Sequence, residues 1–391
     1  MKYNFDKVID RSGTSAEKVE GLKHIWGRTD LIPLWVADMD FATAPFVTDA
    51  IRKRCENEVL GYTGKPDSYY NAIINWVKQR YDLIVTKEMI NFVPGIVPGI
   101  GMAMNCFTQK GDKVMIQPPV YHPFAWVTTR NERTLVTNPL KWENGMYRMD
   151  LDTFREQIKG CKLFILCNPH NPGGVVWTEA ELRAIADICY DEKVLVFSDE
   201  IHADLTLPPH THRPFATVSE KARMNSVTFM SPSKAFNMPG LSASHALIFN
   251  EDLRKRFRIY MDAGELDMGH VFAFLSVEAA YSHGTEWLDQ CLAYIQGNID
   301  FVDEFLKKHA PKIKAIRPEA SYLVWLDCRE LQLSQKDLNE FFVDKAHLAL
   351  NDGEMFGKEG IGFMRLNVAS PRCIIEKAMK QLADAYQLYI K

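Results

Sequence analysis

Three stretches of this sequence place polar side chains directly after apolar runs: "VTFMSPSK", "VLVFSDEIH" and "LFILCNPHNPGG". The polar residues that follow are Ser231, Ser233 and Lys234 in the first, Asp199, Glu200 and His202 in the second, and Asn168 and Asn171 in the third. Ligands of parallel sheets bind beyond the carboxyl ends of the strands, so we expect these groups to meet in one crevice. The crevice would hold a lysine, a carboxylate and an amide, a set that is not typical of a metal site.

Lys234 would give this crevice a nucleophile. Removal from water lowers the pKa of a lysine and frees its amine to form a Schiff base with a carbonyl. A carboxylate such as Asp199 suits a cofactor with a protonated ring nitrogen, which is what pyridoxal phosphate needs to act as an electron sink. The hydroxyls of Ser231 and Ser233 would then bind its phosphate. A solvated surface position is the usual alternative for a lysine.

The elements that must position these groups alternate between buried strands and amphipathic helices. Apolar runs rich in Val, Ile, Leu and Phe predict strands at residues 113–119, 162–169, 194–200, 226–233 and 244–250. Between two of them, residues 178–193 predict a helix that opens on a capping box of Thr178 and Glu181. The alternation indicates an α/β fold with a mostly parallel sheet covered by helices on both faces.

The pattern changes after Gly284. A long helical pattern, two strands and a capped helix are predicted there at residues 287–309, 320–327, 362–369 and 334–345. A chain of 391 residues also exceeds the size of a single core. We therefore predict a large domain over residues 48–285, and a smaller α+β domain built from residues 1–47 together with 286–391.

The composition limits the classes of function. The net charge is −4 and long blocks of like charge are missing, so binding to nucleic acid is not expected. Apolar runs fall short of the roughly 20 residues that span a bilayer, and the first residues lack the apolar core of a signal peptide. The eight cysteines are scattered without a CxxC pair, which indicates reduced thiols. We expect a soluble cytoplasmic protein that binds neither membranes nor nucleic acid.

Seven motifs in register carry a resemblance to a known family. "NPHNPGG", "SDEIHADL" and "SPSKAFNMPGL" resemble the fold-type I pyridoxal-phosphate enzymes of the aminotransferase class I/II group. "PLWVADMDF", "PGIVPGI", "QPPVYHPF" and "GFMRLNVASPR" narrow the resemblance to the MalY/PatB branch of cystathionine β-lyase-like C–S lyases. The similarity runs from Asp10 to Pro371. It implies fold type I, with a seven-stranded, mostly parallel sheet between helices and a smaller second domain.

The resemblance also implies roles for residues near the cofactor. Lys234 would bind pyridoxal 5'-phosphate covalently and move the substrate Cα proton, and Asp199 would pair with the ring nitrogen. Asn171 would contact both the phenolic oxygen of the cofactor and the substrate carboxylate, although asparagine before proline is also common in turns. His202 stands where many aminotransferases have a tyrosine that contacts the same phenolic oxygen, and a structural histidine is the alternative.

A stacking residue and a phosphate cradle follow from the same resemblance. Tyr121 would stack on the pyridine ring and take part in catalysis, although core packing would also explain a tyrosine there. The backbone amides of Ile96 and Val97, at the start of an apolar helix, would meet the phosphate at a helix N-terminus. Ser231 and Ser233 would complete the cradle.

The remaining roles concern charge and the partner subunit. Many aminotransferases have an arginine eight residues past the lysine, whereas this chain has Ser242. Tyr62 in "GYTGKP" resembles a tyrosine that reaches the phosphate of the other subunit, which implies a homodimer with shared active sites. Arg365 lies on the predicted strand 362–369, where a half-buried guanidinium needs a partner. The resemblance makes that partner the α-carboxylate of the substrate, and a structural salt bridge is the alternative.

Two reactions of an amino-acid substrate stay open at this point. Loss of the Cα proton precedes both elimination from Cβ and transamination, and the same lysine, aspartate and arginine serve both. Dicarboxylate aminotransferases usually add a second arginine, for which we find no recognisable motif. We therefore expect a carbon–sulfur lyase that eliminates thiol from L-cystathionine or related cysteine S-conjugates and yields pyruvate and ammonia. An aminotransferase is the alternative, and a regulatory, partner-binding protein is an alternative of another class.

Overall fold

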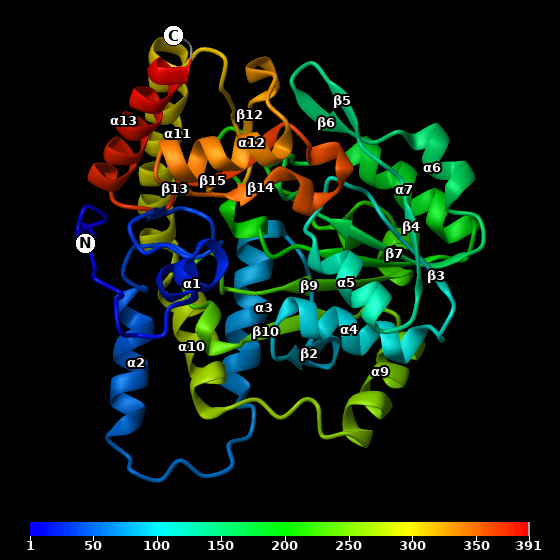
Figure 1. The fold of residues 1–391 in the computed structure, drawn as a ribbon. Helices are drawn as coiled ribbons and strands as arrows, with labels where there is room; N and C mark the ends of the chain where they lie inside the picture. The colour runs from blue at the N-terminus through cyan, green and yellow to red at the C-terminus, as the bar shows by residue number, and fades with distance from the viewer. Residues whose placement is uncertain (390–391) are drawn as a thin grey trace.

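The computed structural model describes residues 1–389, and its central element is a seven-stranded sheet (Figure 1). In spatial order the strands are β2 (Ile90–Val93), β10 (Ser244–Leu247), β9 (Ser226–Met230), β8 (Leu195–Asp199), β7 (Cys161–Cys167), β3 (Lys113–Ile116) and β4 (Thr134–Thr137). Strand β10 is antiparallel to both of its neighbours, and the other pairs are parallel. The predicted α/β class with a mostly parallel sheet is confirmed.

The register of three neighbouring strands brings their carboxyl ends to one edge. Cys167 at the end of β7 pairs with Asp199 at the end of β8, and Asp199 pairs with Phe229 of β9. The chain leaves each of these strands at the same height, so the turns that follow converge. This arrangement is what the crevice inferred from the sequence requires.

Helices cover both faces of the large sheet. They are α2 (Pro45–Cys55), α3 (Asp67–Tyr81), α4 (Ile96–Phe107), α5 (Pro123–Arg130), α6 (Leu151–Gln157), α7 (Glu179–Asp191), α8 (Glu220–Met224), α9 (Glu251–Ala263) and α10 (Val271–His283). Along β7, Leu163 and Ile165 pack into one apolar cluster with α4, whereas Phe164 and Leu166 pack into another with α7. Both faces of the strand are therefore buried, as is typical of parallel sheets.

Helix α7 begins at the capping box that the sequence predicts. Thr178 Oγ1 accepts a hydrogen bond from the backbone N–H of Glu181, whose side chain accepts one from the N–H of Thr178. These two bonds satisfy donors that a helix N-terminus otherwise leaves open.

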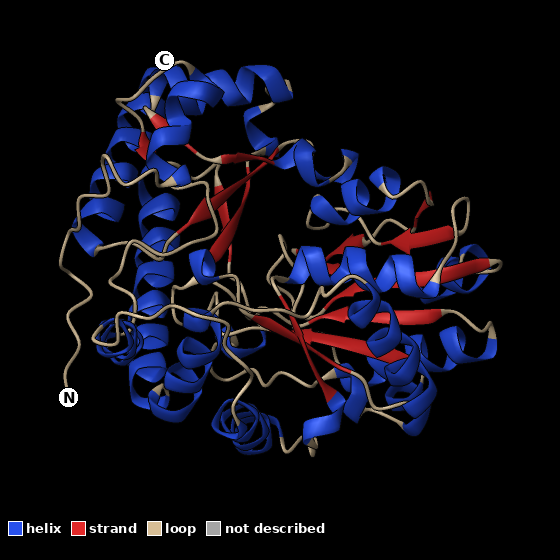
Figure 2. Cartoon of the chain, turned by 90° about the horizontal axis from the view of Figure 1, so that it is seen from below, coloured by secondary structure: helices blue, strands red, loops and turns tan. Residues whose placement is uncertain are grey.

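A four-stranded antiparallel sheet forms a second group of strands, separate from the first in Figure 2. Its strands are β11 (Lys314–Ile316), β12 (Leu323–Asp327), β15 (Phe363–Asn367) and β14 (Asn351–Asp352). The helices of this part of the chain are α11 (Thr285–His309), α12 (Gln335–Glu340), which continues as a π-helical turn (Phe341–Lys345), and α13 (Arg372–Tyr389).

The N-terminal segment joins this second group. Strand β1 (Ile32–Pro33) follows α1 (Glu17–Trp26) and pairs in parallel with β13 (Leu348–Ala349). A hairpin of β5 (Lys141–Glu143) and β6 (Met146–Arg148) completes the strands. The arrangement agrees with a small domain made from both ends of the chain, but the boundaries at residues 47/48 and 285/286 stay a prediction.

Strand β15 is more deeply buried than the sequence suggests. Period-two alternation predicts a half-buried strand for Arg365, yet all five residues of β15 are buried. The strand lies between β12 and β14, and Phe363 stacks on Trp325 in the apolar cluster that also contains residues of α7. The rings of Trp142 and Tyr147, in the β5–β6 hairpin, also lie against Phe363, so aromatic side chains from outside the small sheet cover this face.

Within residues 1–389, the helices include none with the length and apolarity needed to cross a bilayer.

Candidate active site

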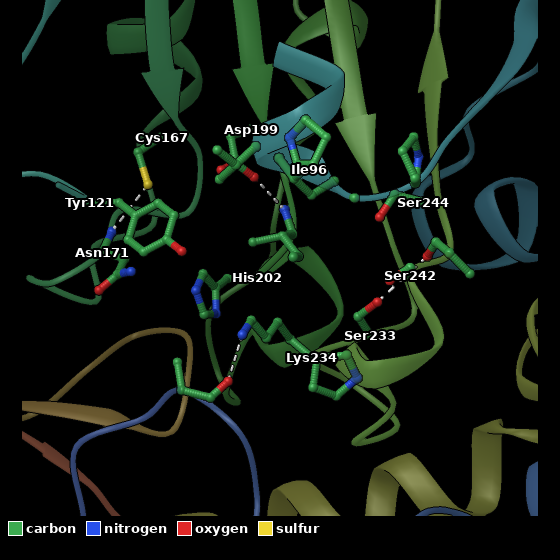
Figure 3. A pocket seen from close by; sticks show the side chains of 18 residues that line it. Ile96, Tyr121, Cys167, Asn171, Asp199, His202, Ser233, Lys234, Ser242 and Ser244 are labelled. Carbon is green, nitrogen blue, oxygen red and sulfur yellow. Dashed lines mark hydrogen bonds between the residues drawn. The ribbon is translucent and has the colours of Figure 1, made fainter. Parts of the chain in front are cut away.

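A cavity of about 200 Å³ lies where β7, β8 and β9 end, beside the first turn of α4. Eight of the residues singled out in the sequence line it: Ile96, Val97, Tyr121, Asn171, Asp199, His202, Ser233 and Lys234. Figure 3 shows Tyr121 and Asn171 on one side of this space and the serines on the other, with Lys234 between them. The structure thus brings together side chains that are up to 138 positions apart in the sequence, counting from Ile96 to Lys234.

Lys234 enters the cavity from the turn that follows β9. Its Nζ donates a hydrogen bond to the carbonyl oxygen of Ala37 at 2.6 Å. Removal from water lowers the pKa of Lys234 to about 8, although the negative charge of Asp38 opposes the shift. A large fraction of the side chain is therefore a neutral amine at a pH only slightly above neutrality, and the neutral amine is the nucleophilic form.

Asp199 ends β8 and is buried at the opposite wall of the cavity from the loop of Lys234 (Figure 3). Its Oδ1 accepts a hydrogen bond from the backbone N–H of Ile201 at 3.1 Å. Burial raises the pKa of Asp199 to about 7. A cationic partner would lower this pKa again, because an adjacent positive charge favours the ionised form of a carboxyl group.

The first turn of α4 provides open hydrogen-bond donors. The helix begins at Ile96 after Gly95, and no side chain caps this end. The amides of Ile96 and Val97 are among the N–H groups that a helix N-terminus leaves without partners, and such groups attract anions.

Ser231 does not line the part of the cavity that is formed by Ser233 and the first turn of α4. The cavity lining includes Ser233 but omits Ser231. The hydroxyl of Ser231 donates to the carbonyl of Ala243 at 2.8 Å, accepts from the backbone N–H of Ser233 at 3.1 Å, and lies 2.7 Å from the Ser233 hydroxyl. In this structure Ser231 supports Ser233, and its direct contact with the phosphate stays a prediction.

Three lining residues were missed as site residues. Ser242 and Ser244 lie beside Ser233 in the cavity, and Cys167 lies near Asn171. Ser242 could have been found from its spacing to the lysine, and Cys167 from its place at the end of an apolar run. The backbone N–H of Asn171 donates to the Cys167 sulfur at 3.3 Å, so the thiol helps to hold the asparagine turn.

Tyr121 and His202 present rings to the cavity. Burial raises the pKa of the Tyr121 hydroxyl, so it is a neutral phenol at physiological pH. Burial also lowers the pKa of His202 to about 3, so its ring is neutral, and its Nδ1 is buried without a hydrogen-bond partner. The cavity therefore holds an unsatisfied ring nitrogen beside the amine of Lys234.

Arg365 contacts the site through Asn171, although it is not part of the lining. Its Nη1 donates to Asn171 Oδ1 at 3.1 Å, and its Nη2 donates to Asn351 Oδ1 at 2.5 Å and to the carbonyl of Trp35 at 3.2 Å. Nε is buried without a partner. Within residues 1–389, no carboxylate lies within 4.0 Å of this guanidinium, so the structural salt bridge is not found.

The environment of Arg365 is unfavourable for its charge. The residue is 3% exposed, and burial lowers its pKa to about 10. A buried guanidinium without a counter-ion is costly. Arg365 is therefore a buried cation next to Asn171 whose charge an anionic ligand would neutralise.

Tyr62 is the one predicted site residue that lies far from this group. It is 99% exposed and belongs to the loop between α2 and α3. It lines a separate surface hollow together with Leu60 and Met268. Within a single chain it does not reach the cavity, so its predicted contact depends on a second subunit.

The residues of the cavity fit pyridoxal 5'-phosphate. Lys234 offers an amine of lowered pKa, Asp199 a buried acid for a ring nitrogen, and Tyr121 an aromatic face. The open amides of α4 and the hydroxyl of Ser233 lie together at one wall and offer donors for a phosphate. The donors at the start of α4 are open, because no side chain caps this end of the helix.

Comparison with known proteins gives matches over nearly the whole chain. A family model described as aminotransferase class I and II matches residues 29–382. Cystathionine beta-lyase PatB of Bacillus subtilis is 38% identical over 384 residues, which cover 98% of this chain and 99% of that protein. Cystalysin from Treponema denticola, solved with a pyridoxal 5'-phosphate cofactor, has a TM-score of 0.96 at 33% identity and covers 100% of both chains.

A second solved structure, the PLP-bound C–S lyase from Staphylococcus hominis, has a TM-score of 0.91 at 35% identity over 99% of this chain and 98% of that one. The sequence motifs, the cavity at the strand ends and these end-to-end similarities agree with one another. The chain belongs to the aminotransferase class I and II family.

Proposed function

We propose that this protein is a pyridoxal-phosphate-dependent carbon–sulfur β-lyase. It would convert L-cystathionine or related cysteine S-conjugates to a thiol, pyruvate and ammonia. The observation that carries the proposal is the placement of Lys234 and Asp199 in one cavity, with the unpaired guanidinium of Arg365 beside it. The end-to-end similarity to a cystathionine beta-lyase and to a C–S lyase supports the choice of reaction.

The substrate would be held by its carboxylate. Arg365 and Asn171 are hydrogen-bonded to each other at one end of the site, and an α-carboxylate would complete the donors of the guanidinium. Fixing this group places the Cα–H bond near Lys234, which counts as orientation of the reacting atoms.

Lys234 would act twice, as the covalent anchor of the cofactor and as the base. Bound pyridoxal phosphate supplies the electron sink. With a pKa of about 8, the neutral amine of Lys234 takes the proton from Cα. The Cβ–S bond then breaks, the sulfur leaves as a thiolate that takes up a proton, and water completes the conversion to pyruvate and ammonia.

The other residues would hold the cofactor. Asp199 would keep the ring nitrogen protonated, and the ring of Tyr121 would cover the pyridine face. His202 would use its open ring nitrogen at the phenolic oxygen of the cofactor, together with Asn171. Ser233 and the first turn of α4 would bind the phosphate.

Turnover of L-cystathionine separates this proposal from transamination. The purified protein is incubated with pyridoxal phosphate and L-cystathionine, and pyruvate and free thiol are measured with and without an α-keto acid. We expect both products in the tube without the keto acid. Product formation only when the keto acid is present would identify an aminotransferase and contradict the lyase.

A homodimer with shared active sites is a further part of the proposal. Its support is the exposed apolar surface around Tyr62, where Val59, Leu60 and Met268 are each more than half exposed beside a hollow of about 1090 Å³. In the dimer, Tyr62 would reach the phosphate of the partner subunit. Sedimentation at micromolar concentration should give twice the mass of one chain, and a monomer that binds the cofactor equally well would contradict shared sites.

We also propose a cytoplasmic location. All eight cysteines are free thiols in the structure, which suits a reducing compartment.

A further inference from the structure

One backbone segment links Arg365 to Lys234. The carbonyl oxygens of four successive residues, Trp35 to Asp38, are each held by side chains that belong to the site or its support. Arg365 Nη2 donates to Trp35, and Lys234 Nζ donates to Ala37. We call residues 35–38 the strap, because they cross from the small sheet to the loop of the reactive lysine.

Asn367 holds the strap on both sides of Ala37. The side chain is fully buried on β15, two residues after Arg365. Its Nδ2 donates to the carbonyl of Val36 at 2.6 Å and to that of Asp38 at 2.7 Å, and its Oδ1 accepts from the backbone N–H of Ala369 at 2.8 Å. One amide group therefore fixes the two peptide units that flank the Ala37 carbonyl.

The Ala37 carbonyl receives two donors from the other side. Lys234 Nζ lies 2.6 Å away, and the hydroxyl of Tyr322, also fully buried, donates to the same oxygen at 2.9 Å. Asp38 is anchored in turn, because its carboxylate lies 2.6 Å from Arg11 and its carbonyl also accepts from the buried Lys18 at 3.3 Å. The acceptor for the lysine is therefore held rigidly.

We propose that Asn367 is a positioning residue for the reactive lysine: it aims the Ala37 carbonyl at Lys234 Nζ and so holds the uncombined amine in the cavity. The proposal rests on the role of Lys234 in the proposed function. In that function the amine is free before the cofactor binds and again whenever the lysine releases it. A fixed acceptor keeps the amine near the reacting atoms during those periods, so that it does not swing away.

Several charged or titratable groups face Lys234 and contribute to its pKa. Asp38 of the strap and Asp199 at the end of β8 favour the ammonium form, whereas Arg365 on β15 opposes it. The neutral ring of His202 and the hydroxyl of Tyr322 also lie at this amine or its acceptor. A substitution at Asn367 removes none of these charges, and Arg11 and Lys18 still hold the carboxylate of Asp38. A change in the pKa of Lys234 would therefore report on its acceptor.

Competitive acetylation of the full chain, freed of cofactor, tests the proposal. Trace acetic anhydride is added across a pH series, and mass spectrometry of the Lys234 peptide gives the pKa of that amine. The exposed Lys336 serves as an internal standard. Asn367→Leu keeps the number and branching of the side-chain heavy atoms but removes both donors and the acceptor of the Ala369 N–H, so the ammonium loses its fixed acceptor. We expect the pKa of Lys234 to fall by about one pH unit, which corresponds to one charge-assisted hydrogen bond.

Asn298→Leu is the matched control. Asn298 is also fully buried, and its Nδ2 likewise bridges two carbonyls, those of Val368 and Ser370, at 2.8 and 2.9 Å. It does not touch the strap, so the pKa of Lys234 should stay at its wild-type value. If Asn367→Leu does not fold, Asn367→Ser, which cannot bridge both carbonyls, decides the question in the same way.

An equal pKa of Lys234 in the wild type, the folded Asn367 variant and Asn298→Leu would overturn the proposal. A fall that is confined to the Asn367 variant would support it. The measurement uses neither substrate nor turnover. A negative result in this measurement would overturn the role of Asn367, whereas a negative result in the lyase assay would overturn the proposed reaction.

Discussion

Replacing Arg365 by leucine separates substrate binding from stability. The guanidinium makes three hydrogen bonds, leaves Nε without a partner, and lacks a carboxylate within 4.0 Å among the described residues. Leucine would leave the oxygens of Asn171, Asn351 and Trp35 with fewer donors and would end the contact of the guanidinium with the ring of Phe356, but it would also remove a buried charge that no carboxylate neutralises. Because these effects oppose each other, we expect the free energy of unfolding to change by about 1–2 kcal/mol at most.

The expected effect on catalysis is much larger. A carboxylate bound by Arg365 would lose two charge-assisted hydrogen bonds of about 1.5–3 kcal/mol each. Together they amount to a loss of roughly 10²- to 10⁴-fold in kcat/KM. Arg365→Lys keeps the charge but not the planar fork, so it should fall between the wild type and Arg365→Leu. Pyruvate release at varied L-cystathionine gives kcat/KM, and urea unfolding of the same preparations gives stability.

Arg133 is the matched control for Arg365. It is another buried arginine, but all three of its guanidinium nitrogens have partners. Its Nε and Nη2 donate to Thr108 at the C-terminal end of α4, where a helix also favours a positive charge. Arg133→Leu should therefore lose about 2–4 kcal/mol of stability and keep kcat/KM. Should Arg365→Leu lose as much stability as Arg133→Leu and retain kcat/KM within about threefold, the carboxylate role is refuted.

Three further substitutions test the cavity. Lys234→Ala should abolish both turnover and the visible absorbance of the bound cofactor; a variant that keeps its turnover would exclude Lys234 as the base. In the cofactor-free protein, the raised pKa of Asp199 makes the native state bind an extra proton between about pH 4 and pH 7, so stability falls as pH rises through that window. Asp199→Asn should therefore be more stable than the wild type by about 2–4 kcal/mol at pH 8, with no difference below pH 4 in urea titrations. Ser242→Arg should lower the dissociation constant of pyridoxal phosphate about tenfold, as measured by fluorescence quenching, because it adds a cation beside Ser233; weaker binding would show that the phosphate lies elsewhere.

The residues at the strand ends were predictable because their positions follow from local sequence. An apolar run such as "VLVFSDE" fixes where β8 ends, and parallel pairing places its end level with those of β7 and β9. The helix at Thr178 was equally accessible, since its capping box lies within four residues. Local rules of this kind predict that Lys234, Asp199 and Asn171 lie at one edge of the sheet, and the structure places all three in one cavity.

Contacts that depend on distant parts of the chain are the ones that the sequence alone cannot predict. Ser231 and Ser233 look alike in sequence, and both hydroxyls donate to the carbonyl of Ala243, at 2.8 and 3.5 Å, but only Ser233 lines the cavity. The burial of Arg365 depends on side chains from other parts of the chain, such as Phe356, whose ring centroid lies 4.8 Å from the guanidinium carbon. Tyr62 depends on a second chain, which no pattern within one sequence can position.

The charges of the site are balanced only when ligands are included. Arg365 and Lys234 have lowered pKa values and Asp199 a raised one, so burial disfavours the charged form of all three groups. Replacing buried charged groups by apolar residues of similar volume often costs little stability, so the presence of these three groups indicates a role in binding ligands. A ring nitrogen that carries a proton favours the ionised form of Asp199, and a carboxylate favours the charged form of Arg365. Burial disfavours the charged form of each group by itself, but it strengthens the interaction of each group with an oppositely charged ligand, because charges interact more strongly away from water.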